Sequence, residues 1–229
     1  MFETFVYSSM NDSPARHPEI RQRLLDSAAV VFTEKGFQAA TVREICRLAK
    51  ANVAAINYHF RDKNGLYSEV LKQLHAELMR RSHKAMAEGA ELPAEARFRI
   101  FVRSYLRGLF GKGRSSWFGK LILREMAQPT TSLDSLIDAS IRPNFERLSS
   151  IISKLMGRKR VDDQTELCVF CVIAQCTYFS ICRDVVSHLK PKIQMTPEMI
   201  DRIADHIIEF SLGAFRHFST LKGKRRAKR

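Results

Sequence analysis

The sequence lacks any apolar run long enough to cross a membrane. A spanning helix needs about 20 predominantly apolar residues, and charged residues interrupt each hydrophobic stretch of this 229-residue chain before that length. The first ten residues also lack the basic start and apolar core of a secretory signal. Because 45% of the residues are hydrophobic, the composition predicts a cytoplasmic protein with a buried core of its own.

Cysteine is scarce and unevenly distributed. Cys46 stands alone, and the other four lie within one apolar stretch, at Cys168, Cys171, Cys176 and Cys182. An odd number of cysteines crowded in this way is more typical of reduced, buried thiols than of a disulfide framework. The Cys168-x-x-Cys171 spacing leaves a metal or redox-sensing site as an alternative, but zinc ligands usually come from more than one segment. We expect no metal and no cofactor.

Catalytic signatures are missing as well. The sequence contains no phosphate-binding glycine loop, no nucleophile elbow and no His-Glu-x-x-His motif. We therefore expect that the protein is not an enzyme. Two alternatives to the function derived below are a small-molecule-binding enzyme and a helical protein-interaction module, both without specific DNA binding.

Positive charge is in excess, at +14, and it is concentrated at the end of the chain. The last eight residues carry six lysines and arginines and no acidic residue. Such a run attracts phosphates without sequence preference, although terminal basic runs are also often simply solvated. We predict a basic tail at 222–229 and assign it no role.

Apolar residues recur at helical spacing along most of the chain, without the alternation typical of β-strands, and this predicts an all-α fold. Residues 1–18 are polar and aperiodic, so we expect a flexible arm. The first helix is predicted from Glu19 to a glycine stop at Gly36. Further helices are expected at 63–87, 94–111, 116–127, 134–156, 162–187 and 197–219, with Pro143 kinking or breaking the helix at 134–156.

Two short helices and the tight turn between them are predicted from their caps. Thr41 and Glu44 have the spacing of a capping box, and Asn52 caps a second helix from Val53 to about His59. Asp62 then caps the long helix that follows. This arrangement is a helix-turn-helix, in which the second helix is the part that enters a major groove of DNA.

Nine residues of this segment are candidates for contact with DNA. Small side chains at Ala54 and Ala55 let a recognition helix approach the groove, and Asn57 can reach a base edge. Thr41 and Arg43 stand at a helix start, where free backbone amides favour a phosphate. The full set is Thr41, Arg43, Asn52, Ala54, Ala55, Asn57, Tyr58, His59 and Lys63. Taken alone, Tyr58-His59-Phe60 would more often be packing residues of an ordinary helical hairpin than binding residues.

The same segment resembles the DNA-binding domain of the TetR/AcrR family of regulators, over roughly residues 19–67. The resemblance is carried by Thr41-Val42-Arg43-Glu44-Ile45-Cys46 and by Asn52-Val53-Ala54-Ala55-Ile56-Asn57-Tyr58-His59-Phe60-Arg61-Asp62-Lys63-Asn64-Gly65-Leu66-Tyr67. It implies phosphate contacts for Thr41, Tyr58, His59 and Lys63, and base proximity for Arg43, Ala54 and Asn57. The sequence departs from the family at Lys50, where the family usually has glycine. If Lys50 must adopt a positive φ, the cost is on the order of 1 kcal/mol.

Segments of the C-terminal part, at 117–130, 174–176 and 203–207, resemble the CecR-type branch of that family. The resemblance implies a homodimer with a DNA-binding domain at 19–65 and a ligand-binding, dimerisation domain at 66–221. It also implies a repressor of efflux, ABC-exporter or drug-sensitivity genes, which binds a palindromic operator and is released by a small-molecule effector.

Candidate residues for the effector pocket are polar or aromatic positions on the predicted C-terminal helices. They are Tyr105, Phe118, Ile122, Arg124, Glu125, Phe145, Cys171, Gln175 and Tyr178. Each of them fits core or dimer packing as well, and Arg124-Glu125 also fits an ion pair. Gln175 is the most informative, because an amide inside an apolar helix needs hydrogen-bond partners.

The last two predicted helices are apolar on more than one face. Residues 167–174 have no polar stripe, and residues 200–218 carry eight large apolar side chains, Phe215 among them. A helix that is apolar all round must be covered on all sides. We therefore expect these helices to form both the core of the subunit and the homodimer interface, with Phe215 at that interface.

Overall fold

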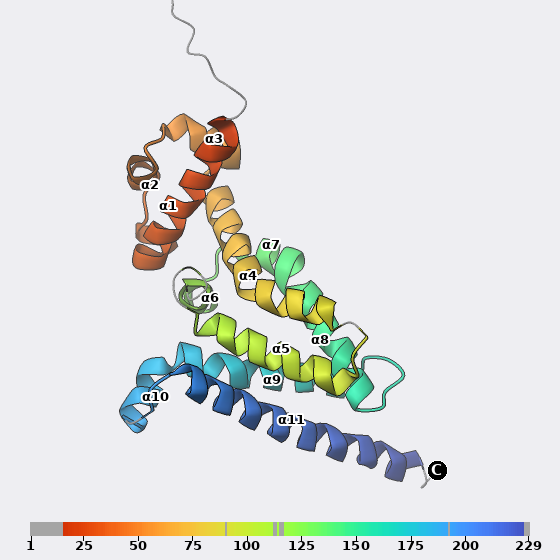
Figure 1. The fold of residues 1–229 in the computed structure, drawn as a ribbon. Helices are drawn as coiled ribbons and strands as arrows, with labels where there is room; N and C mark the ends of the chain where they lie inside the picture. Colours follow the sequence, from red (N-terminus) through yellow and green to blue (C-terminus); the bar gives the residue numbers. More distant parts are fainter. Residues whose placement is uncertain (1–15, 90, 112–113, 115–116, 192, 227–229) are drawn as a thin grey trace, which may run out of the picture. The chain divides into compact units, whose positions relative to one another are not determined.

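The computed structural model describes residues 16–89, 91–111, 114, 117–191 and 193–226 (Figure 1). The regular structure within these ranges is entirely helical, which confirms the predicted all-α fold. The chain divides into two compact units, Met1–Tyr67 and Ser68–Arg229. Most of the expected N-terminal arm and the last three residues of the basic tail lie outside the described residues.

The first unit contains α1 (Arg16–Ala39), α2 (Val42–Ala49), α3 (Val53–Phe60) and the beginning of α4 (Lys63–Glu88). The predicted stop at Gly36 is confirmed, because its φ of 78° interrupts α1 before a last helical turn to Ala39. The unit has a small apolar core, made by Leu24, Ala28, Phe32, Ile45, Ile56, Phe60, Leu66 and Tyr67.

Side-chain caps fix the helix starts of the first unit, as the sequence predicts. The Thr41 hydroxyl accepts from Glu44 N at 3.2 Å, Asn52 Oδ1 accepts from Ala54 N at 3.0 Å, and Asp62 Oδ1 accepts from Gly65 N at 2.8 Å. The second half of the capping box is different. The Glu44 carboxylate accepts from Lys35 Nζ at 2.6 Å and so ties α2 to α1.

The second unit holds the rest of α4 and the remaining helices. In chain order these are α5 (Ala94–Leu109), α6 (Trp117–Ala127), α7 (Ser132–Leu136), the π-helix η2 (Ile137–Ile141), α8 (Arg142–Leu155), α9 (Asp163–Ile181), α10 (Arg183–Leu189) and α11 (Pro197–Arg226). The interruption predicted near Pro143 corresponds to a change of helix type, from the π-helix η2 to α8, with helical φ/ψ kept at Ile141 and Arg142 and with Pro143 in the first turn of α8.

Two predicted helices of this unit differ from the structure. The segment predicted as one helix at 134–156 is divided into α7, η2 and α8, and the segment at 162–187 is divided into α9 and α10 at Cys182. In the other direction, α11 continues through Arg226, so the tail expected from residue 222 begins within a helix.

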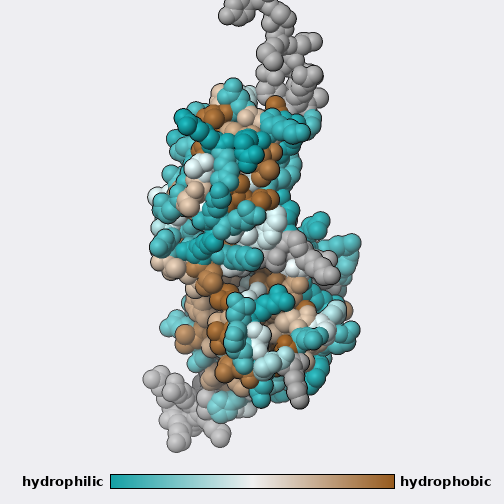
Figure 2. Space-filling view, turned by 90° about the vertical axis from the view of Figure 1, so that its left-hand side faces the viewer, coloured by the Kyte–Doolittle hydropathy of each residue, from teal (hydrophilic) through white to brown (hydrophobic). Residues whose placement is uncertain are grey.

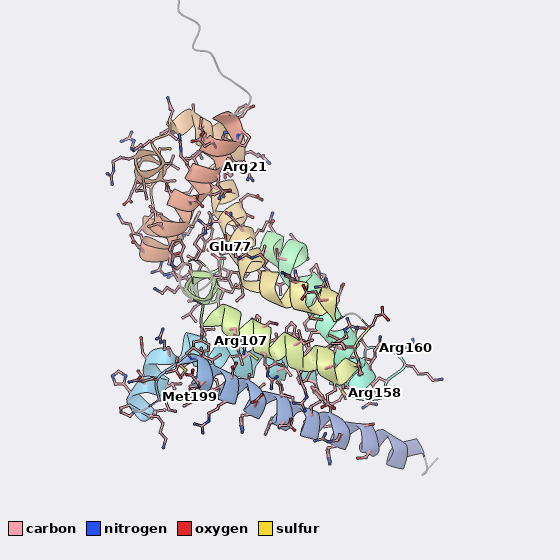
Figure 3. All side chains as sticks on the ribbon, in the orientation of Figure 1. Arg21, Glu77, Arg107, Arg158, Arg160 and Met199 are labelled. Carbon is pink, nitrogen blue, oxygen red and sulfur yellow. The ribbon has the colours of Figure 1, made fainter. Side chains whose placement is uncertain are left out.

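Helix α5 is packed between α8, α9 and α11 and forms the middle of the second unit (Figure 1). Phe98 on α5 meets Phe215 on α11 edge to face, with ring centroids 5.4 Å apart. Ion pairs link the same two helices. One of them joins Arg107, in the last turn of α5, to Asp201, in the first turns of α11, and Figure 3 shows Arg107 at this end of α5. Phe215 is only 2% exposed, so its predicted place at the dimer interface is wrong, and it belongs to the subunit core.

Among the described residues, α9 is long and apolar enough to pass a composition test for a membrane span. It packs on α5, α6, α8 and α11. The result of the composition test differs from the expectation that the sequence lacks such a run, although a single helix of this kind is weak evidence for a membrane span. Cys168, Val169, Val172 and Cys176 are buried inside the protein, but only 28% of the apolar stretch is. Figure 2 shows that hydrophobic side chains also reach the surface of the protein among hydrophilic ones.

Candidate DNA-binding surface and ligand cavity

The turn between α2 and α3 is closed by a residue with positive φ. Lys50 has φ 49° and ψ 47°, and it lies where the left-handed conformation ends a helix. Ala51 N donates to Cys46 O at 3.0 Å and completes the turn. The turn therefore forms with lysine at this position, where the family usually has glycine. The backbone of Lys50 adopts a left-handed conformation that glycine adopts more easily.

The two faces of α3 have opposite roles. Ile56 and Phe60 are buried and fix the helix on the first unit, whereas Ala54, Asn57 and Tyr58 are exposed, Tyr58 by 75%. An exposed face with two small or polar positions and one large phenol is what a helix needs to lie in a major groove. The buried side holds the helix on the first unit, so the opposite face points outward.

The other candidate contacts lie around the same helix. Thr41 and Arg43, at the start of α2, are exposed, as is Asn52, whose side-chain oxygen caps α3. Ala55 and His59 are half-buried, and the His59 ring packs edge to face on Tyr58 with centroids 4.8 Å apart. The fold of the first unit thus places these residues at the start of α2, at the start of α3 and along α3 itself.

Lys63 is held by the protein at the beginning of α4. Its ammonium group lies 4.5 Å from the centroid of the Phe37 ring and donates to Gln38 O at 3.4 Å. Partial burial lowers the pKa of Lys63 from its usual value. The side chain is therefore pre-positioned by contacts within the first unit.

The corner between α3 and α4 depends on Gly65, which sequence reasoning did not single out. A Cβ atom at Gly65 would lie 2.0 Å from the carbonyl oxygen of Phe60. Arg61, between the two helices, has φ 72°, and Arg21 of α1 covers the Phe60 ring at 5.2 Å. The sequence signal was a glycine in the first turn of a capped helix, where the absence of a side chain allows close backbone approach.

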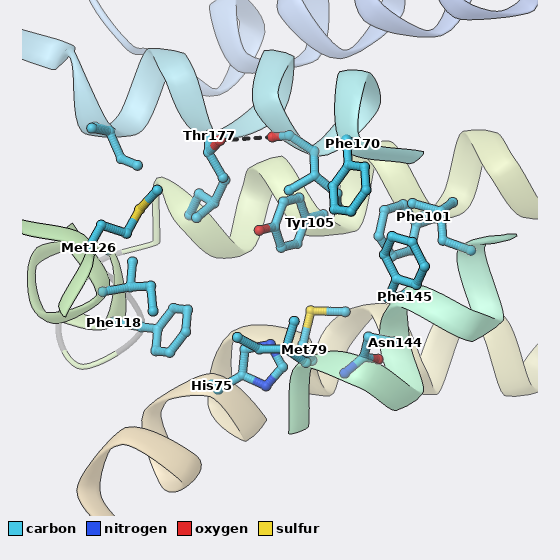
Figure 4. Close-up of a pocket in the computed structure, with 17 residues that line it drawn as sticks. His75, Met79, Phe101, Tyr105, Phe118, Met126, Asn144, Phe145, Phe170 and Thr177 are labelled. Atoms are coloured by element: carbon cyan, nitrogen blue, oxygen red, sulfur yellow. Dashed lines mark hydrogen bonds between the residues drawn. The ribbon is translucent and has the colours of Figure 1, made fainter. Parts of the chain in front are cut away.

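A cavity of about 260 Å³ lies inside the second unit (Figure 4). Its walls come from α4, α5, α6, α8 and α9 and from the last residue of η2, and they are mostly aromatic and aliphatic. Four of the nine predicted pocket residues line it, namely Tyr105, Phe118, Ile122 and Phe145.

The other five predicted pocket residues do not line this cavity. Cys171 and Tyr178 are exposed, and Gln175 Nε2 donates to Cys171 O at 3.2 Å, a bond within its own helix. The cavity is reached instead by Phe170, Ile173, Thr177 and Ile181 on the neighbouring side of α9. Because each residue turns a helix by about 100°, a shift of one position was enough to miss the wall.

Glu125 and Arg124 have different surroundings from those expected. Glu125 is 1% exposed, and its carboxylate accepts from Thr130 N at 3.0 Å and from the Thr130 hydroxyl. It thereby closes the turn after α6. Arg124 is exposed on the same helix. Neither residue lines the cavity, and Glu125 serves the fold of the second unit.

Helix α4 supplies two cavity residues that the sequence reasoning missed, His75 and Met79. The His75 ring packs on Phe118 with centroids 5.0 Å apart. Burial, and to a smaller extent the neighbouring His83, lowers the pKa of His75 to about 4, so the imidazole is neutral at pH 7. The signal in the sequence was a histidine among the apolar positions of a long helix.

The remaining polar groups on the cavity wall come from α5, α8 and α9. Burial raises the pKa of the Tyr105 phenol well above its usual value, so it keeps its proton. The Thr177 hydroxyl donates to Ile173 O at 2.8 Å, and Asn144 Nδ2 donates to Ser140 O at 2.7 Å. Because Asn144 Oδ1 is then the acceptor, the adjoining His83 Nε2 donates to it.

The cysteines are free thiols in different environments. Cys46, Cys168 and Cys176 are buried, and burial raises the pKa of the Cys176 thiol to about 12. Cys171 is exposed and Cys182 half-buried, which corrects the expectation that all are buried. No group of three metal-binding side chains occurs within the described part of the chain.

Two families of regulators match the chain. The family described as bacterial regulatory proteins, tetR family, matches residues 24–70. The family described as the C-terminal domain of the HTH-type transcriptional dual regulator CecR matches residues 94–215, which is more than half of the 229 residues.

Curated relatives match over different lengths. CecR from Shigella flexneri is 25% identical over 177 residues, which cover 73% of this chain and 78% of the relative. YttP from Bacillus subtilis is 36% identical over 55 residues, 24% of this chain and 27% of the relative. BetI from Escherichia coli is 32% identical over 80 residues, 33% of this chain and 41% of the relative. The chain thus spans less than half the length of YttP and of BetI.

Solved structures share the fold at low sequence identity. A transcriptional regulator from Pseudomonas aeruginosa PAO1 has a TM-score of 0.66 and 22% identity, with 86% of this chain and 93% of the other covered. The regulator FadR from Bacillus subtilis, solved in complex with stearoyl-CoA, has a TM-score of 0.64 and 14% identity, with 83% and 97% covered.

Proposed function

Because the chain belongs to the TetR family of bacterial regulatory proteins and carries a CecR-type C-terminal domain, we propose that it is a cytoplasmic, dimeric repressor released from its operator by a small molecule. Its family and relatives are transcriptional regulators and not enzymes. The observation that carries the proposal is α3, whose buried side fixes it on the first unit while Ala54, Asn57 and Tyr58 face outward.

We assign base contacts to the exposed side of α3 and phosphate contacts to its surroundings. Asn57 is placed to bind a base edge, and Ala54 leaves room for close approach. Thr41, Tyr58, His59 and Lys63 would bind phosphates, with Arg43 near the bases, while Asn52 and Ala55 border the groove. This assignment is supported by exposure at the helix-turn-helix and by the fixed position of Lys63.

The homodimer is proposed to form through the outward sides of the last long helices. On α9, the residues Leu167, Cys171, Ala174 and Tyr178 follow one another at helical spacing and are all exposed, and Phe210 on α11 is 62% exposed. An apolar stripe of this kind on a single subunit is a typical contact surface. A two-fold dimer would place two copies of α3 against successive major grooves of a palindromic operator.

Release by an effector is proposed to act through α4. This helix begins beside α3 at Lys63 and carries His75 and Met79 on the cavity wall. A molecule that fits the cavity better in one position of α4 than in another shifts the population toward that position. The structural neighbour FadR from Bacillus subtilis, solved with stearoyl-CoA, supports small-molecule binding by this fold.

The regulated genes are proposed from the resemblance to the CecR-type branch, and they are efflux, ABC-exporter or drug-sensitivity genes. The Shigella relative is described as a dual regulator, which makes activation at some promoters the alternative to repression.

The first test is footprinting of the full-length protein on DNA upstream of its own gene. We expect protection of a near-palindrome that is lost in Asn57→Ala. Lys63→Ala should weaken binding to all sequences alike and lower the salt slope by about one. Lys84→Ala is the matched control, because it removes an exposed cation from the second unit. No specific protection by the folded wild-type protein, upstream of its gene or in a selection from genomic fragments, would contradict the proposal.

A further inference from the structure

The cavity of the second unit has no charged group on its wall. Among the described residues that line it, there is no aspartate, glutamate, lysine or arginine. Its histidine is neutral, because burial holds the pKa of His75 at about 4. A charged molecule entering this space would lose its hydration without gaining a counter-charge, which is strongly unfavourable.

Two polar side chains in the cavity wall have unused hydrogen-bonding capacity. Tyr105 and His75 are 8% and 7% exposed, and neither has a hydrogen-bond partner among the described residues. Figure 4 shows the Tyr105 hydroxyl directed into the cavity and the His75 ring on the opposite wall. Both groups are neutral, so each can donate and accept. Polar groups that the protein leaves unpaired are normally paired with water or a ligand, and both side chains line the cavity, so a ligand that replaces water there can bond to them.

The other polar groups of the wall offer less. The Thr177 hydroxyl donates its only proton to Ile173 O, and the Asn144 amide is held by Ser140 and His83. The protein thus already uses the Thr177 proton, one amide hydrogen of Asn144 and its oxygen, which leaves the second Asn144 hydrogen and the Thr177 oxygen as an acceptor. Among the polar residues of the wall that the structure describes, Tyr105 and His75 are the two whose polar atoms make no hydrogen bond to the protein, so most of the capacity left for a ligand lies there.

Aromatic rings surround the same space. Phe118 packs beside His75, Phe145 beside Phe170 at 5.1 Å, and Phe101 is stacked on Tyr105 at 5.6 Å between ring centroids. Flat apolar ligands stack on such walls in offset or edge-to-face contacts. For size, an engineered apolar cavity of about 150 Å³ accepts one benzene ring. A cavity of about 260 Å³ has room for about two fused rings.

We infer that the cavity selects an uncharged, flat apolar molecule of about two rings that carries one hydrogen-bonding group, such as a hydroxyl, for Tyr105 and His75. The biological meaning of this inference rests on the proposed effector role of the cavity. The predicted class of ligand does not depend on that role, because binding to the cavity can be measured without DNA.

The test is calorimetry of the full-length protein with naphthalene derivatives of one shape and different charge. We expect 2-naphthol, which is uncharged at pH 7, to bind at least tenfold more tightly than naphthalene-2-carboxylate or 2-naphthylmethylammonium. Tyr105→Phe removes only the hydroxyl, so 2-naphthol should bind about three- to tenfold more weakly, while naphthalene should bind as before or slightly more tightly. Ser187→Ala is the control, since it removes an exposed hydroxyl on α10 that lies outside the cavity.

Three results would overturn the inference. They are no binding of 2-naphthol, binding of the carboxylate or the ammonium derivative as tight as that of 2-naphthol or tighter, and a Tyr105→Phe substitution that changes the affinities for 2-naphthol and naphthalene by the same factor. A far-UV circular dichroism spectrum identical to wild type verifies that the variant is folded. If 2-naphthol binds as expected but does not release operator DNA, the ligand class stands and this molecule is not an effector. If operator DNA is not bound at all, the proposed function fails while the ligand class stands.

Discussion

The two units of the protein are stabilised in different ways. In the first, short helices start at side-chain caps three residues or fewer from the amide that they bind, as at Thr41, Asn52 and Asp62. In the second, long helices are fixed by core contacts between distant residues, such as Phe98 with Phe215, and by ion pairs between α5 and α11. The helix starts of the first unit are determined by residues close together in the sequence, and α3 exposes one face. The second unit depends on packing between helices that are far apart in the sequence, and the same packing forms its cavity.

The strongest test of this difference compares two phenylalanines of α11. Phe215→Ala empties a fully packed position, and we expect a loss of about 3–5 kcal/mol in the free energy of unfolding of the second unit. Phe210→Ala removes an exposed ring and should change that free energy little. Urea denaturation followed by the fluorescence of Trp117, the only tryptophan in the chain, measures both.

The same pair separates core from dimer interface. Analytical ultracentrifugation should show Phe210→Ala as a folded protein with a weakened dimer. If Phe215→Ala instead remained fully stable and became monomeric, α11 would bury a different side than the structure shows, and Phe215 would belong to the interface.

Gly65 is the corresponding weak point of the first unit. An alanine in a first helical turn normally stabilises, but at Gly65 its Cβ would meet the Phe60 carbonyl at 2.0 Å. We expect Gly65→Ala to destabilise the first unit by about 3 kcal/mol. Circular dichroism should detect an early thermal transition, while the Trp117 transition in the second unit changes little.

Gly119→Ala is the matched control in the second unit, since its Cβ would be in ordinary contact, 3.7 Å from Ser180 Oγ. It should leave both transitions near their wild-type temperatures. A Gly65→Ala protein as stable as this control would show that the corner between α3 and α4 can shift freely.

The helix-turn-helix was predictable nearly residue by residue because its signals are local. The caps at Thr41, Asn52 and Asp62 and the stop at Gly36 follow from the preferences of single residues. What sequence reasoning missed was that the corner between α3 and α4 leaves no room for a side chain at Gly65. This requirement depends on the distance between two backbone segments, at Phe60 and Gly65, and that distance is defined only in the folded protein.

The cavity was only partly predictable because its wall is set by the rotation of long helices. Tyr105 and Phe118 were identified as aromatic positions on apolar helices, whereas Gln175 was chosen for a polarity that its own helix satisfies. His75 was missed because its signal, a histidine among the apolar positions of a long helix, does not show that α4 borders a cavity. Such facts come from packing between segments far apart in the chain, and periodicity alone does not determine them.

The buried histidine gives the second unit a pH dependence. Since burial lowers the pKa of His75 to about 4, the unfolded chain, with a histidine pKa near 6.5, takes up a proton between these values that the folded unit does not. Stability is therefore complete above about pH 6.5 and is lost as the pH falls toward 4. We expect wild type to lose about 2 kcal/mol more than His75→Leu between pH 7 and pH 5, in urea titrations. His188→Leu, at an exposed histidine, should behave as wild type.

The smallest expected effect returns to the first unit, at the turn that departs from its family. Lys50 adopts φ 49°, a conformation that costs a non-glycine residue about 1 kcal/mol, and part of this is recovered because glycine is more disordered in the unfolded chain. Lys50→Gly should therefore stabilise the first unit by about 0.5 kcal/mol, and Lys50→Val, which tolerates positive φ poorly, should destabilise it. Thermal unfolding by circular dichroism measures both variants. If valine and glycine proved equally stable, the turn would relax out of the left-handed conformation at little cost, and local geometry would specify the first unit less strictly than its caps indicate.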